Sequence, residues 1–328
     1  MLKVGHFVTS EELPTLTIYN FCNYRISNKI RHFIFSDKNY DFLESFRKSN
    51  IHCSVFNKNK LRVLLKKIDI IHFHWSGYNR EEHDLAKKFQ IPFLVSLYKN
   101  EKLPSSIPFI ICPFDFIRKV QGKRDNCVVI YNGIDIQKFK KISNSISQKY
   151  IAMKKKDQKV LIAPGSITQG NYYFWISIQE LLSKISNTKL YIIGPNWISL
   201  KVIKAIKSKR KVYSSIIESE VAIYTPFGSD ILKIQNSFHF IMMVMAMGVP
   251  CVVSRNKITD EVIRHRENGF IISDETPICF VKGIQELLVN NELRQRCIMN
   301  AYKSVKDKFD IKYNTTRYET VIFSLLNR

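Results

Sequence analysis

MAMGVPCVVS, residues 245–254, joins the end of a predicted helix to the start of a predicted buried strand. Gly248 stands where helices commonly stop, because glycine readily adopts the left-handed backbone that closes a helix C-terminus. The apolar run after Pro250 has the length and composition of a strand buried on both faces. A helix, a glycine and a buried strand in this order indicate a parallel α/β fold.

The same alternation continues on both sides of this stretch. Short apolar runs separated by helical periodicity are typical of parallel strands with crossover helices. In the second half, strands are predicted at residues 160–164, 189–193, 221–225 and 250–254, and helices at 173–185, 199–207 and 238–247. In the first half, strands are predicted at 3–7, 31–35, 52–55, 69–74, 93–97, 109–112 and 127–131. The pattern predicts two parallel-sheet α/β domains in tandem.

Chain length and a break in the alternation predict the domain boundaries. A chain of 328 residues with 45% hydrophobic content exceeds the roughly 100 to 200 residues of one typical domain. Residues 143–159 lose the alternation and contain three consecutive lysines, as exposed linkers do. We expect an N-terminal domain over residues 1–150, a C-terminal domain over 151–310, and a helix over 311–328 that returns to the N-terminal domain.

The net charge of +23 indicates an anionic partner, such as a phosphorylated substrate or an anionic membrane surface. A basic, lysine-rich proteome would explain the same balance without any partner. The excess is spread over both halves and accompanies no recognised nucleic-acid-binding motif, so no nucleic-acid partner is expected.

The seven cysteines form no C-x-x-C pair, so neither a disulfide framework nor a zinc site is predicted. The chain shows no signal peptide and no apolar run of the roughly 18 residues that a membrane helix needs. We therefore expect a cytoplasmic protein. Residues 57–67, NKNKLRVLLKK, favour a short basic amphipathic helix that holds the protein peripherally on the inner membrane face. The alternative is that its leucines pack on the sheet and its lysines are solvated.

Two first-half motifs follow predicted strands, where parallel sheets bind their ligands. DIIHFHW, residues 69–75, ends in two imidazoles and an indole, groups that bond to and stack on sugars. The alternative is that one histidine has a partner in the core and Trp75 packs there. VIYNGID, residues 129–135, predicts an Asn-Gly turn in which Gly133 can take a positive φ and Asp135 can cap the next segment.

In their order along the chain, these motifs resemble those of the group 1 nucleotide-sugar glycosyltransferases of family 4 type. DIIHFHW and VIYNGIDIQKF (129–139) are similar to two motifs of the family's first domain. LIAPGS (161–166), LYIIGP (190–195), MAMGVPCVVS and ENGFII (267–272) are similar to motifs of its donor domain. The resemblance covers nearly the whole chain. It implies the GT-B fold, two Rossmann-like domains that face each other across a cleft.

Several functional positions depart from the family pattern. Tyr98 stands where the family has a histidine that contacts the donor sugar. Gln169 lies in a loop in which the family places an arginine and a lysine against the donor diphosphate. Gln235 and Met243 replace a glutamate pair whose second member contacts the donor ribose. Glu261 is the acidic residue of the pattern that remains.

The resemblance implies a set of site residues. Catalytic roles fall on Tyr98, His74 and Glu261, and acceptor-side roles on His72 and Trp75. Donor binding falls on Gly165, Ser166, Gln169, Gly194, Pro195, Asn196, Ser237, Ser254, Arg255 and Lys257. The family likeness implies no metal and no cofactor, with the nucleotide sugar acting as a substrate.

Two functions from different classes remain open, and a GT-B epimerase acting on a nucleotide sugar is a third alternative. The first is a retaining hexosyltransferase that moves a sugar from a nucleotide-sugar donor to a saccharide or lipid-linked acceptor, in the synthesis of bacterial-type surface polysaccharide or lipopolysaccharide. The alternative is a catalytically silent GT-B scaffold or partner subunit, because the phosphate-binding cations and the glutamate pair are absent. Loss of one hydrogen-bond donor that stabilises a departing diphosphate lowers the reaction rate by about 100- to 1000-fold.

Overall fold

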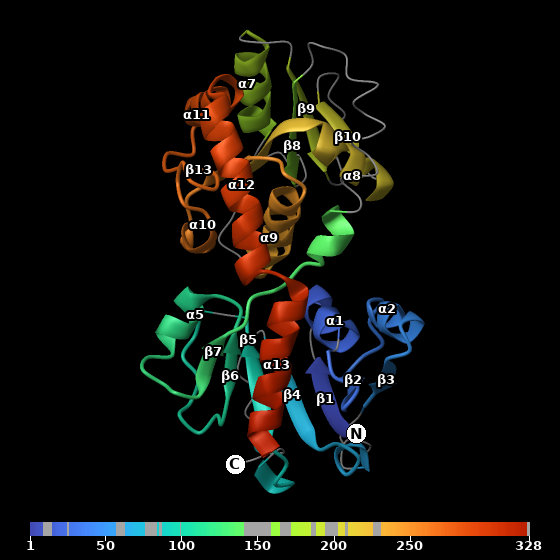
Figure 1. The fold of residues 1–328 in the computed structure, drawn as a ribbon. Coiled ribbons are helices and arrows are strands. Elements are labelled where there is room, and N and C mark those ends of the chain that lie inside the picture. The colour runs from blue at the N-terminus through green and yellow to red at the C-terminus, as the bar shows by residue number, and fades with distance from the viewer. Residues whose placement is uncertain are drawn as a thin grey trace. The chain divides into compact units, whose positions relative to one another are not determined.

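The computed structural model describes residues 1–8, 15–24, 26–56, 63–75, 84, 87–98, 100–140, 159–164, 172–184, 188–193, 203–206, 209–225 and 231–326. These residues form two compact units. The first comprises Met1–Gly133, Ile231–Gln235 and Phe309–Arg328, and the second comprises Ile134–Asp230 and Asn236–Lys308. Each unit is built on one parallel sheet, which confirms the predicted α/β class (Figure 1).

The sheet of the first unit has seven strands in the order β3-β2-β1-β4-β5-β6-β7. The strands are β1 (Leu2–Val8), β2 (Ile30–Ser36), β3 (His52–Val55), β4 (Ile70–Trp75), β5 (Phe93–Leu97), β6 (Ile110–Cys112) and β7 (Cys127–Val129). Every pairing is parallel, and β1 and β4 are adjacent central strands with His6 opposite His72. The helices described in this unit are α1 (Thr15–Asn23), α2 (Leu43–Lys48), α5 (Asp115–Val120) and α13 (Ile311–Leu326).

Helix α13 packs on the first sheet although it ends the chain (Figure 1). Its residues Tyr318, Val321, Ile322 and Leu325 share one core cluster with residues of the sheet strands and of α1. Gly133 approaches the start of α13 so closely that an added Cβ would lie 2.6 Å from Cα of Ile311.

Gly133 does not take the positive φ that the Asn-Gly turn allows, since the described glycines with positive φ are Gly122 and Gly248. Glycine is needed at position 133 because the adjacent backbone leaves no room for a side chain. Asp135 does cap the segment that follows, accepting a hydrogen bond from the backbone of Lys138 at 2.9 Å.

The sheet of the second unit has six parallel strands in the order β10-β9-β8-β11-β12-β13. They are β8 (Lys159–Pro164), β9 (Thr188–Ile193), β10 (Ile203–Ile206), β11 (Ser219–Tyr224), β12 (Cys251–Ser254) and β13 (Phe270–Ile272). Its described helices include α7 (Tyr172–Ser183), α8 (Lys209–Glu218), α9 (Ile231–Ala246), α10 (Lys257–Val262), α11 (Pro277–Val289) and α12 (Asn291–Lys308). Apolar residues of α7, α11, α12 and the strands form its core.

The helix predicted at residues 199–207 is wrong, because Ile203–Ile206 forms the edge strand β10. Ile203 pairs with Leu190 of β9. The apolar positions 203 and 206 suit a helix, whereas 203 and 205 suit a strand, so a run this short has no unique period. Among the described residues, no helix is long and apolar enough to span a membrane.

Candidate functional site

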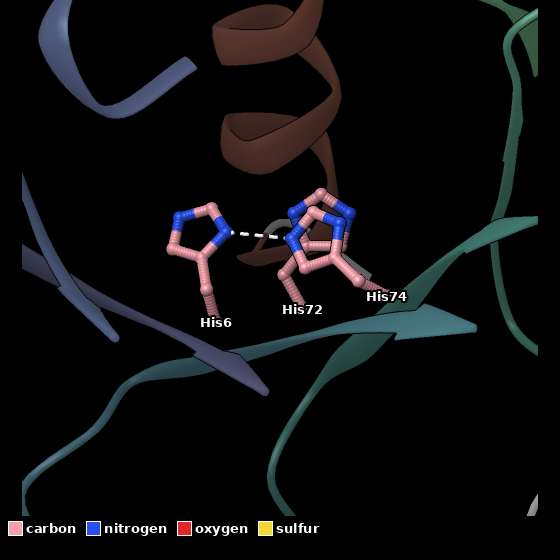
Figure 2. A group of neighbouring side chains, drawn as sticks. All are labelled: His6, His72 and His74. Carbon is pink, nitrogen blue, oxygen red and sulfur yellow. Dashed lines mark hydrogen bonds between the residues drawn. The ribbon is translucent and has the colours of Figure 1, made fainter. Parts of the chain in front are cut away.

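Four histidines meet inside the first unit. His6 comes from β1, His32 from β2, and His72 and His74 from β4. Side chains alternate between the faces of a strand, so residues of even number on these adjacent strands share one face of the sheet. Figure 2 shows His6 and the two rings of β4 drawn together above the sheet.

Three of these imidazoles and one phenol form a hydrogen-bonded chain. Nδ1 of His32 lies 2.8 Å from Nε2 of His6, and Nδ1 of His6 lies 2.9 Å from Nε2 of His74 (Figure 2). Nδ1 of His74 lies 3.0 Å from the hydroxyl of Tyr98, which follows β5. A neutral imidazole donates through one nitrogen and accepts through the other. If the rings are neutral, the hydrogen bonds of the chain therefore all run in one direction.

The fourth imidazole, His72, is held from two sides. Its Nε2 lies 2.7 Å from Oγ of Ser96 on β5, and its Nδ1 lies 3.0 Å from the hydroxyl of Tyr318 on α13. The ring of Tyr318 stacks on Phe21 of α1 with 4.4 Å between centroids. The contacts of His72 thus tie the central strands to the last helix.

Burial controls the protonation of this cluster. Loss of hydration lowers the pKa of His74 to about 3. It also places the pKa of His6 and of His72 well below the ordinary value, and neighbouring histidines lower both further. Burial raises the pKa of Tyr98. At neutral pH the imidazoles of His6, His72 and His74 are uncharged and Tyr98 is a neutral phenol, so the hydrogen bonds of the chain run in one direction.

Of the four residues predicted for the first-domain side of the site, the structure brings together His72, His74 and Tyr98. All three are buried, with Tyr98 only 1% exposed and packed in a cluster with Val8, Ile18 and other apolar residues. The side chain of Trp75 lies outside the described residues. Sequence reasoning missed His6 and His32, which the pairing of β2, β1 and β4 brings to the same face.

In the second unit, two buried hydroxyls lie at the carboxyl edge of the sheet. Ser254 ends β12, and Thr225 directly follows β11. Tyr224 and Val253 are paired, so the next residues on both strands are neighbours. The side-chain oxygens of Ser254 and Thr225 have no hydrogen-bond partner among the described residues, although both residues are buried. Buried hydroxyls normally have partners, so this edge offers two groups to a ligand or to ordered water.

Helix α10 follows Ser254 and begins with a complete capping box. The side chain of Asn256 accepts from the backbone of Ile258 at 2.9 Å and of Thr259 at 3.0 Å. Thr259 returns the contact by accepting from the backbone of Asn256 at 2.8 Å. The cap fixes the direction of α10, and with it the position of Glu261.

The predicted donor residues on α10 and just before it form a charged group. Arg255 and Lys257 are exposed, and Glu261 is half-buried. Arg255 contacts Asp260 at 3.3 Å and Oγ of Ser273 at 3.1 Å. Thr225 also lies at this edge but is not among the predicted donor residues, and it is the last residue of the strand predicted at 221–225.

The other donor-binding predictions cannot be placed. Gly165, Ser166, Gln169, Gly194, Pro195 and Asn196 lie outside the described residues, and Ser237 lies in α9 with its side chain outside them. Met243, also on α9, is buried, so its thioether packs in the apolar interior. Loss of hydration and, to a lesser extent, the charge of Lys138 lower the pKa of His239, on the same helix, to about 4.

Comparisons with known proteins connect this edge of the second unit to one class. Residues 242–304 match the family model of the glycosyl transferases group 1. The matched segment runs from α9 through β12, α10, β13 and α11 into α12. YtcC of Bacillus subtilis (strain 168), a presumed glycosyltransferase, is 22% identical over 300 residues, which cover 74% of this chain and 73% of YtcC.

Two solved structures share the fold over nearly the whole chain. A glycosyltransferase from Rickettsia africae ESF-5 has a TM-score of 0.78 at 14% identity and covers 99% of this chain and 98% of its own. Anabaena Alr3699/HepE, solved with UDP and glucose, has a TM-score of 0.73 at 12% identity. The match covers 99% of this chain and 100% of the Alr3699/HepE chain. The predicted GT-B fold and the resemblance to group 1 glycosyltransferases are confirmed.

Proposed function

We propose that this protein transfers a sugar, with retention of configuration, from a uridine-diphosphate sugar to a saccharide or lipid-linked acceptor in the synthesis of a bacterial-type surface polysaccharide or lipopolysaccharide. The match of residues 242–304 to the group 1 family carries the proposal, because this segment contains Ser254, Arg255, Lys257 and Glu261. The UDP and glucose named with Alr3699/HepE support the choice of donor.

The chemistry of the second unit fits a donor of this kind. A departing diphosphate needs positive charge or oriented donors to stabilise its developing charge. Arg255 and Lys257 are cations beside the carboxyl edge of the sheet, and the hydroxyls of Ser254 and Thr225 are donors without partners among the described residues. Glu261 supplies a carboxylate that accepts hydrogen bonds from sugar hydroxyls.

A panel of nucleotide sugars tests the donor proposal, with UDP release and sugar transfer measured separately. Glu261→Gln should lower kcat/KM for transfer by about 100-fold while leaving the thermal midpoint unchanged, since one lost transition-state contact has that effect. Glu267→Gln is the matched control, because Glu267 is an exposed glutamate of the same unit. Full activity of Glu261→Gln would remove that residue from the site. UDP binding without turnover of any donor would favour the silent scaffold.

For the first unit, we propose that Tyr98 and His74 act in catalysis and that His72 and Trp75 hold the acceptor. Tyr98→Phe removes the hydroxyl that contacts His74 and should lower kcat. Tyr302→Phe, on α12, is the control. If Tyr98→Phe and His74→Ala both leave kcat and KM intact, these side chains have only a structural role.

Lipid-linked acceptors would place the protein at the inner membrane face. We propose that residues 57–67 bind anionic lipid, at about 1 kcal/mol for each basic residue. Residues 57–62 lie outside the described part of the chain, whereas Lys66 and Lys67 are exposed. Sedimentation with anionic vesicles should fall when Lys58, Lys60, Arg62, Lys66 and Lys67 become glutamine.

A matched variant distinguishes the effect of residues 57–67 on vesicle binding from the effect of net charge. It carries the same number of changes at exposed lysines of α11, α12 and α13: Lys282, Lys303, Lys306, Lys308 and Lys312. Equal loss of sedimentation in both variants would show that net charge, and not this segment, attracts the membrane.

A further inference from the structure

Three imidazoles of the first unit converge on one point. His6, His72 and His74 each bring one ring nitrogen within 4.8 Å of the others, and all three side chains are buried. They come from β1 and β4, adjacent central strands that hold the rings in place. Figure 2 shows His6 facing the two rings of β4 across a narrow gap.

The contacts around the cluster match the requirements of metal ligation. A histidine that binds a metal through one nitrogen donates the proton on its other nitrogen to a neighbour, which fixes the ring and its tautomer. If His6 binds through Nδ1, its Nε2 has His32 as an acceptor at 2.8 Å. If His74 binds through Nε2, its Nδ1 has the hydroxyl of Tyr98 as an acceptor at 3.0 Å.

The third ligand is supported in the same way. Both nitrogens of His72 have neighbours, Ser96 at 2.7 Å and Tyr318 at 3.0 Å. When one nitrogen of His72 binds an ion, the other keeps its hydrogen-bond partner, and that bond holds the ring in place.

We propose that His6, His72 and His74 bind a divalent transition-metal ion of the zinc class inside the first unit. The group offers imidazole nitrogen and no carboxylate, which suits Zn²⁺ and its neighbours and disfavours Mg²⁺ and Ca²⁺. Three protein ligands leave a fourth position for water. The ion ties β1 to β4, and this ligand role for His72 and His74 is an alternative to the roles in sugar transfer proposed for them above.

Binding needs only a small separation of the rings of His6 and His74. Nδ1 of His6 and Nε2 of His74 lie 2.9 Å apart, as two nitrogens that share a proton do. Zinc–nitrogen bonds of about 2.0–2.1 Å in a tetrahedral site separate the nitrogens by about 3.3 Å. The ion therefore takes the place of the shared proton, and the rings separate by a few tenths of an ångström. Because the site is buried, the ion enters during folding.

Metal content after refolding tests the proposal on the full chain with any purification tag removed. The protein is unfolded with EDTA, refolded with or without ZnCl₂, freed of excess ion and assayed by plasma mass spectrometry. We expect close to one zinc ion per chain and a higher thermal midpoint with zinc, since an ion bound by the folded state alone stabilises it. Refolding with Co²⁺ should give visible absorption bands of nitrogen-ligated cobalt.

Matched variants distinguish zinc bound at this site from zinc bound by the cysteines or by surface histidines. His6→Gln and His74→Gln should each weaken zinc binding by about 100-fold or more, whereas His52→Gln, an exposed histidine on β3, should bind as the wild type does. A wild-type chain that refolds with no zinc overturns the proposal, whether or not the variants fold. Equal zinc content in the wild type and a folded His6→Gln or His74→Gln variant overturns it too.

Discussion

The hydroxyl of Tyr318 on α13 lies 3.0 Å from Nδ1 of His72 on β4, across 246 residues of sequence. Tyr318→Phe keeps the ring that stacks on Phe21 and leaves a buried imidazole nitrogen without this partner. The free energy of unfolding should fall by about 1–3 kcal/mol. Urea unfolding measures it, with the exposed Tyr313→Phe as control. Equal stability of Tyr318→Phe and wild type would show that this bond contributes nothing.

Glu319, the next residue of α13, fastens the helix to the loop before β2. Its carboxylate accepts from the backbone of Ile26 at 2.8 Å and of Ser27 at 3.1 Å. Hydrogen bonds to a charged group contribute about 1.5–3 kcal/mol, so Glu319→Gln should lose about 1 kcal/mol or more of unfolding free energy. Exposed Glu275→Gln should not change it. The contact is unimportant if both variants unfold at the same urea concentration.

Gly133 has no room for a side chain. In Gly133→Ala, the new Cβ would lie 2.6 Å from Cα of Ile311, and backbone atoms cannot move aside as a flexible side chain can. Overpacking of this kind costs about 1–3 kcal/mol. Gly122→Ala tests a glycine whose added Cβ meets nothing within 4 Å but whose φ is +77°. Faster hydrogen exchange in α13 should accompany Gly133→Ala and not Gly122→Ala.

His239 predicts a pH dependence in the second unit. Its folded-state pKa is lowered to about 4, whereas an unfolded histidine has a pKa of about 6.5. Between these values the unfolded chain binds more protons, so the stability that neutral His239 supports is complete above about pH 6.5 and is lost as the pH falls towards 4. His239→Gln removes the imidazole, so the slope of the unfolding free energy against pH should fall by up to about 1.4 kcal/mol per pH unit. An unchanged slope would contradict the shifted pKa.

Much of the fold could be predicted because its signals are local. The helix end at Gly248 and the buried strand Cys251–Ser254 lie in ten consecutive residues, and both appear in the structure, with Gly248 at a φ of 78°. Strand β10 could not be distinguished from a helix, because four residues on the edge of a sheet contain too few apolar positions to define a period.

The histidine cluster shows where prediction from sequence ends. His72 and His74 stood out because they share one short motif, whereas His6 and His32 lie in strands far apart in the chain. Their meeting depends on the spatial order β2-β1-β4, which is set by packing of the whole unit. The burial of Tyr98 depends on the same packing, and its position after a strand indicated only that it lies at the sheet edge.

The separation of α13 from the rest of its unit in the chain has a consequence for synthesis. A ribosome makes all seven described strands of the first sheet before residue 130, but the helix that covers part of their apolar surface is made only after residue 310. Until then the nascent chain exposes residues such as Phe21, Ile70 and Leu94, which α13 covers in the finished protein. Growing chains of this protein should therefore bind chaperones for most of the time the second unit takes to be made.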